Sequence, residues 1–64
     1  MMNSKSDIVA EMASAANAAG IARKRVSALL MNENLTNEQR TELDYIFRLL
    51  YKSQVRLAKM QVEA

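Results

Sequence analysis

The side chains that most often carry out acid–base or nucleophilic chemistry are scarce in this sequence. Its 64 residues include no histidine and no cysteine, the usual general base near neutral pH and the usual thiol nucleophile. The closest carboxylate pairs are Glu38 with Glu42 and Glu42 with Asp44. All three lie in the expected first turns of a helix, where acidic side chains stabilise the positive end of the helix dipole. We therefore predict no catalytic residues and no enzymatic activity.

The same inventory argues against bound groups. The sequence has no Glu-x-x-His pattern for a metal ion, and its single glycine, Gly20, excludes a glycine-rich loop for phosphates. We predict no metal site and no cofactor.

Charge and hydropathy limit the class of protein. The net charge of +2 indicates a mildly basic surface. No apolar run reaches the roughly 18 residues of a membrane span. The alanine-rich stretch from Ile8 to Ala22 resembles the apolar part of a signal peptide, but Asp7, Glu11 and Asn17 interrupt it. We expect a cytoplasmic protein that neither crosses a membrane nor carries a targeting segment.

The elements that must position any functional surface are two long helices. Proline is absent and good helix formers dominate. Ser4 followed by Asp7, and Thr36 followed by Gln39, are typical of helix starts. Asn32 and Asn34 tolerate the left-handed conformation of a helix C-cap, so the first helix should end near Met31 or Asn32. We predict helices over about 5–31 and 37–62.

Each predicted helix carries an apolar line whose steps alternate between three and four residues, as in a coiled-coil seam. The first line is Ile8, Met12, Ala15, Ala19, Ala22, Val26 and Leu29, and the second is Leu43, Ile46, Leu50, Ser53, Leu57 and Met60. Small residues on the first helix would face large ones on the second. We predict an all-α fold, an antiparallel two-helix hairpin forming a single domain over residues 1–64.

The second helix is apolar beyond its seam. Phe47, Tyr51 and Val55 extend one flank, and the first helix has a second stripe of small residues that includes Ala16 and Gly20. Glycine costs about 1 kcal/mol in a helix interior, which is explained if another helix approaches there. Short chains without disulfides or metals often need a partner for stability. We predict a homodimeric four-helix bundle with these five residues at the interface; the alternative is that they bind a different protein.

A row of cations on the second helix offers another reading. Arg48, Lys52, Arg56 and Lys59 recur at steps of four, four and three and share one helix face. Such a row fits a phosphate backbone, or it simply keeps the bundle in solution. Arg23, Lys24 and Arg25 are consecutive in sequence, so they span a broad sector, and we assign them to solubility.

Several segments resemble known small proteins. They are the opening Ser4-Lys5-Ser6-Asp7-Ile8, the alanine belt to Gly20-Ile21-Ala22, the hinge Asn32-Glu33-Asn34-Leu35-Thr36 and the Tyr-Ile-Phe-Arg run of the second helix. In size and texture the chain resembles the small early proteins of the exo–xis region of lambdoid phages. In architecture alone it is similar to the plasmid regulator Rop, a dimeric hairpin that binds paired RNA loops.

The phage resemblance implies an accessory protein that affects prophage induction, the lysis–lysogeny balance or the host cell cycle. Its partner would be a host or phage protein, and it would act in the host cytoplasm. We predict a non-enzymatic regulatory protein that works by protein–protein interaction. The alternative is a Rop-like hairpin that binds RNA or DNA through the basic row.

Overall fold

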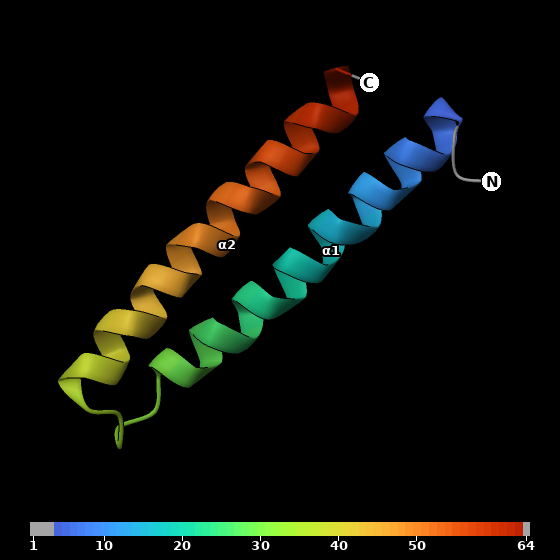
Figure 1. Cartoon of the computed structure of the whole chain (residues 1–64). Coiled ribbons are helices and arrows are strands. Elements are labelled where there is room, and N and C mark those ends of the chain that lie inside the picture. Colours follow the sequence, from blue (N-terminus) through green and yellow to red (C-terminus); the bar gives the residue numbers. More distant parts are fainter. Residues whose placement is uncertain (1–3, 64) are drawn as a thin grey trace.

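A computed structural model describes residues 4–63 as two helices joined by one short loop (Figure 1). Helix α1 spans Lys5–Leu30 and helix α2 spans Asn37–Glu63. They run antiparallel and side by side, with loop 31–36 at one end. The predicted all-α hairpin is confirmed, and each predicted helix differs by one residue at its C-terminal end. Residues 1–3 and 64, which the predicted domain includes, lie outside the described residues.

Both helices begin where side chains can satisfy free backbone N–H groups. The Ser4 hydroxyl oxygen accepts a hydrogen bond from the Asp7 N–H at 3.2 Å. At the start of α2, the Gln39 N–H donates to the Thr36 hydroxyl at 3.1 Å, and the Thr36 N–H donates to the Gln39 side-chain oxygen at 3.0 Å. This reciprocal pair is the capping box predicted from the sequence.

Helix α1 ends differently from the prediction. No residue in loop 31–36 has a positive φ, so the left-handed cap expected near Asn32 is wrong. Met31 keeps right-handed helical angles, and the N–H groups of Met31 and Asn32 donate to carbonyls three residues earlier. The Asn32 side-chain oxygen accepts from the Asn34 N–H at 2.9 Å and turns the chain locally. A tightened last turn thus replaces the left-handed residue.

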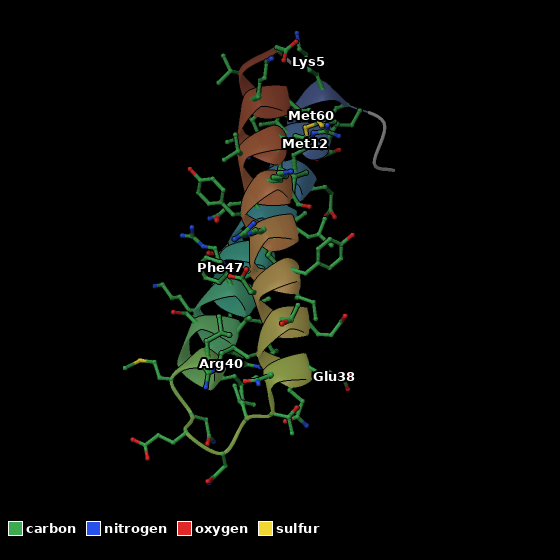
Figure 2. All side chains as sticks on the ribbon, turned by 90° about the vertical axis from the view of Figure 1, so that its left-hand side faces the viewer. Lys5, Met12, Glu38, Arg40, Phe47 and Met60 are labelled. Carbon is green, nitrogen blue, oxygen red and sulfur yellow. The ribbon has the colours of Figure 1, made fainter. Side chains whose placement is uncertain are left out.

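Arg40 fastens the loop from the other helix. Its guanidinium donates to the Leu30 carbonyl at 2.6 Å and to the Asn32 carbonyl at 3.1 Å. These carbonyls lie at and just beyond the end of α1, where the backbone lacks helical partners and the dipole favours a positive charge. Figure 2 shows Arg40 at the loop end, far from Met12 and Met60. One side chain of α2 therefore caps α1 and closes the hairpin.

The hairpin is long and has no enclosed interior. Its extents are 47 × 17 × 14 Å. Among residues 4–63 no side chain is buried, and the residues between the helices are at best half-buried. Two helices can cover only one side of each other, so apolar surface remains exposed on both flanks.

Candidate interaction surfaces

The two helices pack along a seam of half-buried side chains. On α1 the seam comprises Val9, Met12, Ala16, Ala19, Arg23, Val26 and Leu30, and on α2 it comprises Leu43, Phe47, Leu50, Gln54, Leu57 and Gln61. The steps alternate between three and four residues on both helices, as the sequence predicted. The spacing is therefore that of a coiled coil.

The predicted seam is nevertheless wrong at about every second position. Met12, Ala19 and Val26, like the three leucines of α2, remain in the seam, and Ala22 is half-buried as predicted. The other predicted positions are exposed, and the residue that follows each of them is half-buried instead. Ile8, Leu29, Ile46 and Met60, all assigned to the seam from the sequence, are 45%, 49%, 40% and 48% exposed. Each helix therefore has two neighbouring lines of residues that could form the seam. The hairpin packs the line that contains Arg23 on α1 and Gln54 on α2, although these two residues are polar.

Gly20 lies where the helices approach closely. A β-carbon added there would lie 2.8 Å from the side-chain nitrogen of Gln54, closer than van der Waals contact permits. Ala16, one turn earlier, is half-buried in the seam. Both residues were predicted to meet a second chain, which stays a prediction. The close approach that the glycine permits is already made within one chain.

Arg23 organises an aromatic surface between the helices. Its guanidinium carbon lies 5.9 Å from the centre of the Phe47 ring and 5.3 Å from that of Tyr51, within the range of cation–π attraction. Arg23, Lys24, Ser27 and Phe47 line a shallow hollow of about 250 Å³. The sequence reading assigned Arg23 to solubility. The feature that could have placed Arg23 in the seam is its spacing, since it lies four residues after Ala19 and three before Val26.

Tyr51 and Val55 continue this surface outward along α2. They are 52% and 50% exposed, whereas Phe47 is half-buried in the seam. We call Arg23, Phe47, Tyr51 and Val55 the aromatic flank. The structure thus brings together three of the five predicted interface residues and adds an arginine to them.

The opposite flank is aliphatic. Ile8, Leu29, Ile46 and Met60 each directly precede a seam residue. In an antiparallel pair of right-handed helices, these positions of both helices lie on the same side of the hairpin. Leu49, which is 45% exposed, borders them. We call these five residues the aliphatic face; Ala15 and Ser53 occupy equivalent positions between them.

The basic row lies on the side of α2 that faces away from α1. Arg48, Lys52, Arg56 and Lys59 are all exposed. A salt bridge of 3.1 Å joins Arg48 to Asp44 one turn earlier, as expected for oppositely charged residues four apart. The other three cations have no ion pair among the described residues. The row is thus a solvated strip of positive charge.

Of the carboxylates considered for catalysis, Glu38 and Glu42 are exposed and Asp44 is half-buried. Glu38 and Glu42 line an open depression of about 480 Å³ together with Asn37 and Thr41, in the first turns of α2. Within residues 4–63, no three potential metal ligands gather in one place.

Neither described helix combines the length and apolar character needed to cross a membrane. Comparisons with protein-family models, characterised proteins and solved structures found no match for this chain.

Proposed function

We propose that this chain is a non-enzymatic regulatory protein that binds another protein through the aromatic flank. The observation that carries the proposal is the cation–π contact of Arg23 with Tyr51, beside the exposed Val55. Tyrosine and arginine are the residues most enriched among the side chains that dominate protein interfaces. The cation–π contact also restrains the guanidinium before a partner binds, which lowers the entropy lost on binding.

The flank defines the chemistry of its partner. Tyr51 and Val55 offer apolar area, while Arg23 and Lys24 border the adjoining hollow with positive charge. A protein segment that carries a large apolar side chain next to a carboxylate meets both features. From the resemblance to phage early proteins, we propose a host or phage protein as the partner and the host cytoplasm as the place of action.

Two tyrosines on α2 provide a matched test. Tyr51 lies under Arg23, whereas Tyr45 is 60% exposed and has no such contact among the described residues. We expect Tyr51→Ala to weaken binding of a protein captured from host lysate about 30-fold, the effect of an interface residue worth about 2 kcal/mol. Tyr45→Ala should change binding less than about threefold. Titration of the purified partner against each variant measures both.

Two results of this experiment would count against binding through the aromatic flank. Equal loss in both variants, with helical content unchanged by circular dichroism, would contradict binding through the aromatic flank. Capture that disappears after nuclease treatment would also contradict it, because the protein would then have been held through nucleic acid.

The exposed basic row supports a second candidate, nucleic-acid binding. Lys52 and Lys59 face solvent without an ion pair in the described part of the chain. If the row follows a phosphate backbone, Lys52→Glu with Lys59→Glu should abolish RNA or DNA binding at 50 mM salt. The affinity of the wild-type chain for the nucleic acid should itself fall by an order of magnitude or more between 50 and 200 mM salt. Under the favoured function, the same double variant retains the protein partner.

A further inference from the structure

We propose that a second copy of this chain covers the aliphatic face, so that two hairpins form a four-helix bundle with α1 of one chain packed against α2 of the other. The interface differs from the one expected from the sequence, which used Phe47, Tyr51 and Val55. It also leaves the aromatic flank free, so it goes beyond the proposed function and does not depend on it.

The exposed area of the chain favours an additional interface. A compact protein of 7.2 kDa exposes about 4,100 Å², whereas this chain exposes 5273 Å². The difference, about 1,100 Å² per chain, is comparable to the roughly 800 Å² that each partner buries in a standard stable interface. A second hairpin therefore removes the amount of surface that the single hairpin leaves in excess.

The distribution of polar residues shows which side the second copy takes. The positions directly before the seam hold Ile8, Ala15, Ala22 and Leu29 on α1 and Ile46, Ser53 and Met60 on α2. The seam itself contains Arg23, Gln54 and Gln61. Apart from the half-buried Ala22, this side faces solvent in one hairpin and carries no charged residue, whereas the seam between the helices contains Arg23. In a four-helix bundle each helix has two neighbours and needs this wider apolar arc.

Charges at the edge of the aliphatic face match a second copy. At steps of seven, α1 carries Glu11, Ala18 and Arg25 there, and α2 carries Glu42, Leu49 and Arg56. The contact of Arg23 with Phe47 sets the register of the hairpin. In that register the acidic residue of each helix lies level with the basic residue of the other, to within about one helical turn.

This charge pattern is complementary when two hairpins are related by a two-fold axis parallel to the helices. It places α2 of the second chain beside α1 of the first, with the two loops at the same end. Each Glu11 then lies beside the partner's Arg56, and each Arg25 lies beside the partner's Glu42. Ala18 and Leu49 meet between the charged pairs, a small residue against a large one, which permits close packing.

Two aspartate substitutions test which flank is covered. We expect the wild-type chain to show about twice 7.2 kDa in sedimentation equilibrium at 50 µM. Ile46→Asp on the aliphatic face should abolish the dimer, because it would bury an unpaired carboxylate. Val55→Asp, the same kind of change on the aromatic flank, should leave the mass unchanged. A monomeric wild-type chain, or a dimer lost with Val55→Asp and kept with Ile46→Asp, would overturn the proposal.

A charge swap keeps the test decisive if Ile46→Asp fails to fold. Glu11→Arg alone should weaken the dimer about tenfold, because it sets two cations beside each other in both symmetry-related pairs. Adding Arg56→Glu should restore the affinity to within about threefold, since each pair is then reversed. A dimer that Glu11→Arg weakens and the double variant does not recover overturns this arrangement. If Ile46→Asp still binds the partner protein while Tyr51→Ala does not, the aliphatic face and the aromatic flank act separately.

Discussion

Replacement of Leu50 by alanine is expected to lower the free energy of unfolding by about 2 kcal/mol, measured in urea at one fixed protein concentration. Leu50 is half-buried near the middle of the α2 seam, one turn from both Phe47 and Gln54. A small domain has about 0.05–0.15 kcal/mol of stability per residue, so this loss is a large share of the total. The cause is the lost apolar contact together with the gap left between the helices.

Val62→Ala is the control for Leu50→Ala. Val62 lies on the same helix but is 88% exposed, so its truncation should change the unfolding free energy by less than about 0.5 kcal/mol. Similar losses in both variants would show that the exposed end of α2 is as well packed as the seam, contrary to the structure.

The helices and their starts follow from local interactions, which is why the sequence predicts them well. Thr36 and Gln39 are three residues apart and cap each other through two hydrogen bonds. The spacing of these residue types is sufficient to locate the start of α2. The prediction failed at the end of α1, where Arg40 donates to Leu30 ten residues away. Such a contact depends on how the two helices pack in the hairpin, and the spacing of neighbouring residues in the sequence does not reveal that.

The choice of seam depends on competition between neighbouring apolar columns. Periodicity alone favours the column of Ile46 and Met60, because it is uninterrupted by charge. The hairpin instead packs the column of Phe47 and Gln54. Long polar side chains tolerate this half-buried position, since their aliphatic stems pack while their ends reach water. The cation–π contacts of Arg23 add to the preference. A single sequence does not rank these terms against each other.

The position of the seam also bears on the predicted interface, which stays a prediction. From the sequence, the apolar arc of α2 appears as one surplus to be used once, either by a second copy or by a target. With the seam at its observed position, the surplus is divided between the aromatic flank and the aliphatic face. The two proposals, self-association and target binding, then use opposite sides of the hairpin, and the proposed dimer would present two aromatic flanks. Such a dimer can bind two copies of a target, which raises the effective affinity for a target that is itself oligomeric.

Substitutions at Gly20 are expected to act in opposite directions according to size. Gly20→Ala should raise the free energy of unfolding by up to about 1 kcal/mol, because alanine is the better helix former. The added carbon would meet the side-chain nitrogen of Gln54 at 2.8 Å, but that atom is the end of a flexible side chain and can move. Gly20→Leu has no such escape, and the helices must separate. We expect it to cost about 2–3 kcal/mol in urea unfolding.

Gln54→Ala distinguishes the cause of the Gly20 effect. If crowding against Gln54 limits the site, then Gly20→Leu combined with Gln54→Ala should recover at least half of the stability lost by Gly20→Leu alone, because the shortened side chain leaves room for the leucine. If instead a second chain packs directly on Gly20, Gly20→Ala should already weaken the dimer and Gln54→Ala should rescue nothing. The structure predicts the first result, because Gln54 of the same chain fills the space over the glycine. The proposed dimer accordingly uses the aliphatic face, away from Gly20.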